Sequence, residues 1–152
     1  MDVYPEFRAL FASLNRHGVE YVIVGAYALA HYGVPRATQD IDVLVHASPE
    51  HASRVMAALD EFGFGDVGLT EQDFAQPHFV FRLGRPPAQV DLLTVIPGVS
   101  WAEVWAHRSP GQYGDVPVSY IGREQFIRNK RASDRLQDRA DAERLEDDGE
   151  DE

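Results

Sequence analysis

The sequence of 152 residues contains no cysteine. This absence excludes a disulfide framework, a thiolate zinc site and a cysteine nucleophile, and it leaves the redox compartment undetermined. Long apolar runs are also missing, since no segment approaches the roughly 18 residues that a membrane-spanning helix needs. The N-terminal segment has neither the basic start nor the unbroken apolar stretch of a secretory signal. We therefore expect a cytoplasmic protein with no membrane partner.

Positive charge is scarce, and the negative charge is unevenly distributed. The chain has 14 Lys and Arg against 25 Asp and Glu, and its net charge is -11. Six of the acids lie in the last seven residues, EDDGEDE, so residues 1–145 carry only -5. A block of like charges cannot pack. We predict one domain over residues 1–145 and a disordered acidic tail over residues 146–152.

Apolar periodicity and capping residues predict helices packed on a mixed sheet, an α/β or α+β fold. Helices are expected at 3–16, 26–33, 49–62, a short segment after Ser100, and 124–145 with a break near Ser133. Strands are expected at 21–24, 40–45, 78–83, 89–96 and 116–121. The two strands 78–83 and 89–96 are joined by Gly-Arg-Pro-Pro, which suits a hairpin or a loop between neighbouring strands.

Three aspartates lie on two of the expected strands. Asp40 and Asp42 are two residues apart, so both side chains leave the same face of one strand, about 7 Å apart. Asp91 lies between apolar residues on another strand and approaches the pair to roughly 5 Å if the strands are neighbours. A carboxylate in a buried run costs several kcal/mol unless a cation or donor compensates it. Hard oxygen ligands without thiolate favour Mg²⁺ or Mn²⁺.

Gly25 ends one expected strand and begins a short helix, where the backbone can approach an anion closely. Arg36 is placed to reach the same phosphates, and Thr38 is placed to cap or orient the following loop. Lys130 is the only lysine, and we expect it to contact phosphate. The segment matches neither the dinucleotide-fold nor the P-loop fingerprint. No pair of histidines has metal-ligand spacing, so His46 is expected to be a packing or surface residue.

The segment VIVGAYALAHYGVPRATQDIDVLV resembles the active-site segment of nucleotidyltransferases of the DNA polymerase beta-like superfamily. Their pattern is a hydrophobic residue, Gly-Gly or Gly-Ser, a spacer, and Asp-x-Asp. The likeness is greatest to the small bacterial AbiEii-like toxin group, in which a segment like FIRNKRASDRLQDRADAERL follows the third acid. The resemblance spans Tyr21 to Leu145, and Asp138 and Asp141 occupy the C-terminal helix positions of that group.

This resemblance implies roles for individual residues. Asp40 and Asp42 would hold both metal ions, Asp91 would hold the catalytic ion and act as the base toward the acceptor hydroxyl, and Lys130 would contact the triphosphate. Ala26 departs from the pattern, because it stands where the family has Gly or Ser. Its backbone N–H remains available to a phosphate, so we expect weaker or altered triphosphate binding.

The residues and the resemblance together predict a metal-dependent nucleotidyltransferase, which moves a nucleoside monophosphate from an NTP to an acceptor hydroxyl. The acceptor is a tRNA 3′ end, a protein side chain or a small molecule. The resemblance also implies the toxin of a toxin–antitoxin pair, with a cognate antitoxin as partner. Two alternatives stay open: a glycosyltransferase using Asp-x-Asp with Mn²⁺, and a non-catalytic nucleotide-binding or antitoxin-like module of the same fold.

Overall fold

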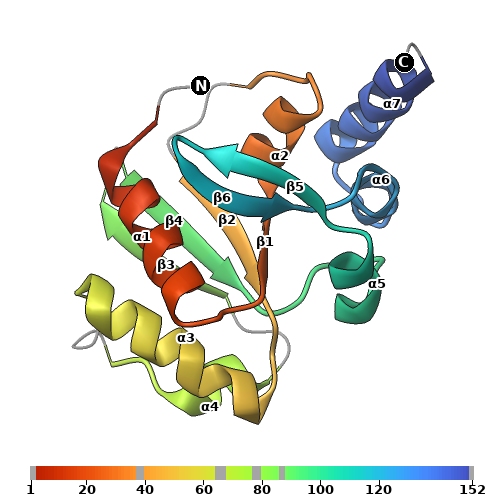
Figure 1. Ribbon diagram of the computed structural model, residues 1–152. Helices are drawn as coiled ribbons and strands as arrows, with labels where there is room; N and C mark the ends of the chain where they lie inside the picture. The colour runs from red at the N-terminus through yellow and green to blue at the C-terminus, as the bar shows by residue number, and fades with distance from the viewer. Residues whose placement is uncertain (1–2, 37–39, 64–67, 77–79, 86–87, 151–152) are drawn as a thin grey trace.

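The computed structural model describes residues 3–36, 40–63, 68–76, 80–85 and 88–150 (Figure 1). In this part of the chain, six strands form one mixed sheet in the order β3-β4-β2-β1-β6-β5. The strands are β1 Tyr21–Val24, β2 Asp40–Val45, β3 Val80–Arg85, β4 Ala88–Leu93, β5 Ser109–Tyr113 and β6 Val116–Tyr120. The α/β fold class expected from the sequence is confirmed.

Helices pack on both faces of this sheet (Figure 1). They are α1 Pro5–Arg16, α2 Gly25–His31, α3 Pro49–Phe62, α4 Glu71–Ala75, α5 Trp101–Ala106, α6 Arg123–Arg131 and α7 Leu136–Glu150. Two expected caps are present: the Ser48 hydroxyl accepts from the His51 N–H, and the Ser100 hydroxyl accepts from the Glu103 N–H. No helix of the described ranges combines the length and apolar character that crossing a bilayer requires.

One register row crosses four strands of the sheet. Val24 on β1 pairs with Asp42 on β2, Asp42 pairs with Asp91 on β4, and Asp91 pairs with Arg82 on β3. Strands β2 and β4 are parallel, whereas β3 and β4 form an antiparallel hairpin, one of the two connections expected between them. The pleat therefore places the side chains of this row on one face of the sheet.

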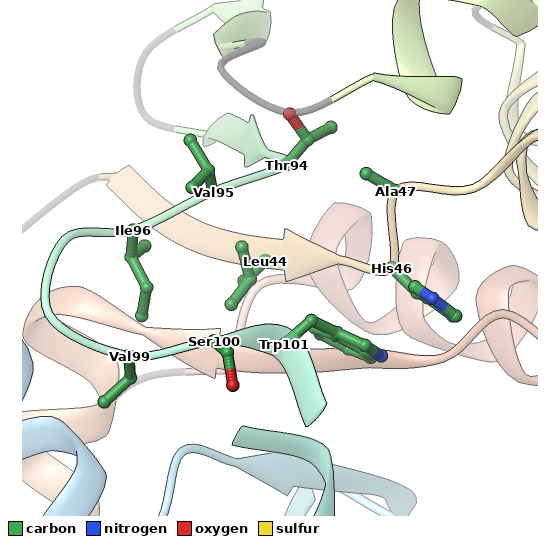
Figure 2. Close-up of a pocket in the computed structure, with 9 residues that line it drawn as sticks. All are labelled: Leu44, His46, Ala47, Thr94, Val95, Ile96, Val99, Ser100 and Trp101. Atoms are coloured by element: carbon green, nitrogen blue, oxygen red, sulfur yellow. The ribbon is translucent and has the colours of Figure 1, made fainter. Parts of the chain in front are cut away.

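The chain turns back over this face after β4. The segment 94–101 curves around Leu44 of β2, with Val95 on one side and Ser100 on the other, and together they line a cavity of about 240 Å³ (Figure 2). His46 and Trp101 flank its end, and their rings stack with centroids 5.2 Å apart. Ile96 lines this cavity and also the larger one described below.

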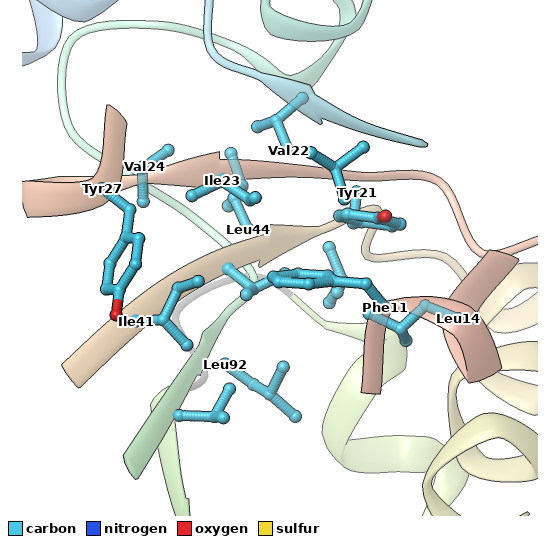
Figure 3. Close-up of a cluster of buried hydrophobic side chains, with 14 of the residues drawn as sticks. Phe11, Leu14, Tyr21, Val22, Ile23, Val24, Tyr27, Ile41, Leu44 and Leu92 are labelled. Carbon is cyan, nitrogen blue, oxygen red and sulfur yellow. The ribbon is translucent and has the colours of Figure 1, made fainter. Parts of the chain in front are cut away.

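The opposite face of the sheet carries the main hydrophobic core (Figure 3). Phe11 and Leu14 of α1 are fully buried against Tyr21, Ile41 and Leu92 of three strands. The Phe11 and Tyr21 rings stack with centroids 5.6 Å apart. Alternation along β2 explains the division: its odd-numbered aliphatic residues face this core, and its even-numbered aspartates face away from it.

The structure differs from the expected elements in three places. Strand β5 was not predicted, because its sequence SPGQY contains proline and glycine; β5 is an edge strand, where proline is tolerated. Helix α4 was also missed, although Thr70 and Asp73 form a capping box at its start. Helix α7 continues to Glu150, so residues 146–150 are helical where disorder was expected. An ion pair between Arg131 and Glu146 ties this extension to α6.

Candidate active site

Asp42 and Asp91 face each other across two parallel strands, as the sequence predicted if those strands were neighbours. The Asp91 side chain is 17% exposed, and Asp40, two residues before Asp42, is 36% exposed. Burial raises the pKa of the Asp42 carboxyl to about 6, with further contributions from the charge and hydrogen bond of Asp91 and from Asp40, opposed by Lys130. Two ionised carboxylates held this close repel each other, and a bound cation would reduce that repulsion.

Gly25 brings the backbone directly against this pair. Its φ of +70° lies in the left-handed region, and a Cβ at this position would overlap the Oδ2 of Asp42. Only glycine therefore allows β1 to turn into α2 at this distance from the carboxylate. Ala26 follows in the first turn of α2 and is partly buried.

A cavity of about 310 Å³ opens beside Gly25 and Asp42. Most of its polar lining comes from α6, α7 and the segment between them: Asn129, Lys130, Ser133, Arg135 and Asp138. Phe126 and Ile96 add apolar surface. The cavity thus combines the carboxylates of Asp42 and Asp138 with the cationic groups of Lys130 and Arg135, a combination suited to a metal-bound phosphate chain.

The Lys130 side chain is held by two acids of α7. Its Nζ lies 3.0 Å from Asp138 Oδ1 and 3.5 Å from Asp141 Oδ2, and it is 13% exposed. Asp141 is 1% exposed and also accepts from the guanidinium of Arg36, with Nη1 at 2.8 Å. Gln137 donates a further hydrogen bond to Asp141 at 3.1 Å. Lys130 therefore reaches the cavity wall from a fixed position.

Of the predicted phosphate contacts, Gly25 and Lys130 line the same cavity as Asp42. Arg36 is engaged by Asp141 in this structure, so its phosphate contact stays a prediction. Thr38 lies outside the described residues. The roles assigned to Asp40, Asp42, Asp91, Ala26 and Lys130 likewise stay predictions.

Replacing Asp141 by asparagine is expected to destabilise the protein by about 2 to 3 kcal/mol. The substitution removes the buried negative charge that Arg36, Lys130 and Gln137 contact. Burial opposes ionisation of Asp141, but the hydrogen bonds of Arg36 and Gln137 and the charge of Lys130 outweigh it and lower its pKa. A carboxyl with a lowered folded-state pKa stabilises above its unfolded pKa, and that stability is lost on acidification.

Denaturant unfolding at pH 7 measures the effect of Asp141→Asn. Asp138→Asn is the matched control, since Asp138 contacts the same lysine but is 13% exposed. We expect a smaller loss for that variant. An equal or larger loss in Asp138→Asn would show that Asp141 is not the centre of the network.

Arg82 is a site residue that the sequence analysis missed. Its Nε lies 2.8 Å from Asp91 Oδ1, its Nη2 lies 3.2 Å from Asp91 Oδ2, and Nη2 is 3.8 Å from Asp40 Oδ2. The signal was the hairpin itself, because its register places Arg82 directly opposite Asp91. Aligning the two predicted strands as a hairpin about the short connection between them would have placed Arg82 opposite Asp91.

A second group of possible metal ligands lies at the far end of β2. One ligand atom each from Glu20, His46 and His51 can be chosen so that all lie within 4.8 Å of one another. In the described residues this is the only such group of three, and the aspartates do not meet that limit. His46 was expected to be a packing or surface residue, and it does stack on Trp101; its proximity to Glu20 and His51 was not predicted from the spacing of the histidines in the sequence.

The hydrogen bonds of this group explain its geometry without an ion. His51 Nε2 accepts the Glu20 backbone N–H at 2.7 Å, and His46 Nδ1 lies 2.9 Å from Glu20 Oε1. The N–H directed at His51 Nε2 uses the lone pair that a metal would need. The aspartates, where Arg82 contacts Asp91, stay the predicted position of a divalent cation.

Comparison with solved structures identifies the architecture. A nucleotidyltransferase-like antigenic protein from Paracoccidioides brasiliensis superposes with a TM-score of 0.57 at 18% identity, covering 93% of this chain and 73% of that one. The chain has a nucleotidyltransferase-like fold. The lincomycin-bound lincosamide antibiotic adenylyltransferase LnuA superposes with a TM-score of 0.53 at 13% identity, covering 96% and 98% of the two chains. No protein-family model and no curated protein matches this sequence.

Proposed function

We propose that this protein is a metal-dependent nucleotidyltransferase, which transfers a nucleoside monophosphate from an NTP to an acceptor hydroxyl. The observation that carries the proposal is the register row in which Asp42 faces Asp91, with Gly25 against Asp42 and Lys130 in the cavity that Asp42 lines. The nucleotidyltransferase-like fold supports it. Neither feature alone assigns a reaction, but Asp42 lines a cavity that Gly25 and Lys130 also line.

The residues fit a divalent cation of the Mg²⁺ type. The donors are carboxylate oxygens without thiolate, and Asp42 bears the unfavourable charge that a cation would neutralise. Asp42, Asp91 and Asp40 would hold Mg²⁺ or Mn²⁺. The ion would supply neutralisation of the phosphate charge and activation of the attacking oxygen.

The chain's own residues have separate tasks in this reaction. Gly25 lets the phosphate chain approach the backbone, and Lys130, which lines the same cavity, neutralises part of its charge. The acceptor oxygen attacks the α-phosphorus, the bond from that phosphorus to the α–β bridging oxygen breaks, and pyrophosphate leaves. Asp91 takes the proton of the acceptor hydroxyl. Phe126 and Ile96 add apolar surface to the cavity.

The acceptor remains one of three classes: a tRNA 3′ end, a protein hydroxyl or a small molecule. Membership in the AbiEii-like toxin group, with a cognate antitoxin as partner and action in the cytoplasm, rests on the sequence resemblance alone. LnuA is a lincosamide antibiotic adenylyltransferase whose structure contains bound lincomycin. That neighbour supports nucleotide transfer and leaves the acceptor of this chain open.

Two assays test the proposal. Calorimetry with each of the four NTPs and Mg²⁺ measures binding, and incubation with labelled NTP and cell extract reveals a labelled acceptor. We expect metal-dependent NTP binding, transfer of label, and release of pyrophosphate. Tight NTP binding without pyrophosphate release would instead support a non-catalytic module. Binding of a nucleotide sugar in preference to every NTP would support the glycosyltransferase alternative.

Replacing Lys130 by glutamine is expected to weaken metal-dependent NTP binding by about tenfold to a hundredfold, because one charge-assisted phosphate contact is lost. Calorimetry measures the change. Arg131→Gln is the matched control: it removes an equal charge from the same helix at an exposed residue paired with Glu146. Equal losses in both variants would mean that the effect is general electrostatics and that Lys130 has no specific role.

A further inference from the structure

Arg82 lies at one end of the register row that defines the candidate site. Along that row the order is Val24, Asp42, Asp91 and Arg82, and Gly25 follows Val24. The glycine turn is therefore at one end of the carboxylates and the guanidinium at the other. A nucleotide in the cavity beside Gly25 and Lys130 would leave the Arg82 side of Asp91 to other groups.

The contacts of Arg82 are those of a bound counter-ion. Its guanidinium makes a two-point contact with both Asp91 oxygens, at 2.8 and 3.2 Å, and approaches Asp40 at 3.8 Å. The acids whose charges act on it are Asp91, Asp40 and Asp42. Its side chain is 58% exposed, so solvent can accommodate it in another position. Arg82 thus stabilises three close carboxylates and is free to leave them.

A divalent ion and the guanidinium of Arg82 cannot both bind the Asp91 carboxylate without weakening each other's contact with it. The guanidinium uses both oxygens, and two cations on one carboxylate repel each other strongly at a separation near 4 Å. One oxygen each from Asp40, Asp42 and Asp91 cannot be chosen so that all three lie within 4.8 Å of one another, so a site that uses all three acids requires their rearrangement. Moving Arg82 away is the smallest change that frees Asp91.

We propose that Arg82 is an internal counter-ion of the carboxylate site, which holds Asp91 and Asp40 before metal binds and is displaced when metal enters. This inference rests on the proposed function, since it concerns the same metal site. Arg82 acts through the aspartates and is therefore a positioning residue. Its presence lowers the affinity of the nucleotide-free protein for metal and keeps the carboxylates from repelling one another until metal arrives.

Calorimetric titration with Mn²⁺ alone tests the proposal in four proteins: the wild type, Arg82→Gln, Arg82→Lys and Arg8→Gln. We expect Arg82→Gln to bind Mn²⁺ about tenfold more tightly, because a competing charged contact is removed. Arg82→Lys keeps the competing charge and should stay near the wild type. Arg8 is the matched control, since it makes a similar two-point contact with Asp115 away from the site and should change nothing.

The outcomes distinguish a failure of the counter-ion role of Arg82 from a failure of the proposed function. Unchanged or weaker Mn²⁺ binding by Arg82→Gln, in a wild type that binds both Mn²⁺ and NTP, would overturn the counter-ion role and leave the proposed function standing. A wild type that binds neither Mn²⁺ nor NTP would overturn both. A purely structural arginine would not give tighter binding on removal, and circular dichroism of each variant shows whether its fold is retained.

Discussion

Asp42→Asn is expected to abolish metal-dependent NTP binding and to reduce nucleotidyl transfer by about a thousandfold, because metal neutralisation of phosphate contributes several kcal/mol to the transition state. Asp42 carries this effect because it faces Asp91, lies against Gly25 and lines the cavity. The assays are calorimetry with NTP and Mg²⁺ and transfer of labelled nucleotide to the acceptor. Asparagine is nearly the same size, so packing is preserved.

The same substitution is expected to stabilise the metal-free protein. Burial and Asp91 raise the pKa of Asp42 to about 6, above its unfolded value near 3.8. The folded state therefore binds the proton more tightly, and wild-type stability falls as the pH rises from about 4 to about 6. Above pH 6 without metal, Asp42→Asn should gain on the order of 2 kcal/mol, and near pH 3 the gain should disappear.

Thermal unfolding at several pH values, without divalent ions, measures this difference. Asp60→Asn, an exposed aspartate of α3 on the other side of the sheet, is the control for charge removal in general. An Asp42→Asn protein that loses stability at pH 8 would show that the carboxylate is a structural partner. Retained metal-dependent NTP binding would show that it is not a metal ligand.

Gly25→Ala is expected to eliminate metal and NTP binding and to cost about 2 to 4 kcal/mol of stability. A methyl group at this position overlaps Asp42 Oδ2 and also forces alanine to a φ of +70°. The overlap pushes the Asp42 carboxylate out of the row with Asp91, so the chemical effect is larger than backbone strain alone would give. Calorimetry and denaturant unfolding measure the two losses separately.

Gly68→Ala separates strain from overlap. Gly68 has a similar φ of +85°, and a Cβ there would meet nothing within 4 Å. We expect that variant to lose about 1 kcal/mol of stability and to bind metal and NTP normally. If Gly25→Ala behaved like Gly68→Ala, the close approach of the backbone to Asp42 would have no functional importance.

The local features of the sequence predicted most of the fold. Alternating carboxylate and aliphatic residues fixed the exposed and buried faces of β2, and the capping serines Ser48 and Ser100 marked the starts of α3 and α5. The position of Asp91 beside Asp42 followed once the strands were assumed to be neighbours, and the observed register confirms that pairing. These features depend on residues close in sequence or on one strand pairing.

Features that depend on distant contacts were not predicted. The proximity of Glu20, His46 and His51 arises where a loop, a strand end and a helix meet, so sequence spacing carries no sign of it. Helix α7 was expected to end near Leu145, but the ion pair of Arg131 with Glu146 joins its extension to α6. Arg36 is likewise held by Asp141, 105 positions away in the chain.

The central claim is that Asp42 and Asp91, with Asp40, hold the divalent ion. Anomalous diffraction from crystals grown with Mn²⁺ and a non-hydrolysable NTP tests it most directly. We predict an anomalous peak between Asp42 and Asp91, with the triphosphate beside Gly25 and Arg82 moved off Asp91. A peak only at Glu20, His46 and His51, or a nucleotide bound away from Gly25 and Lys130, would contradict the assignment.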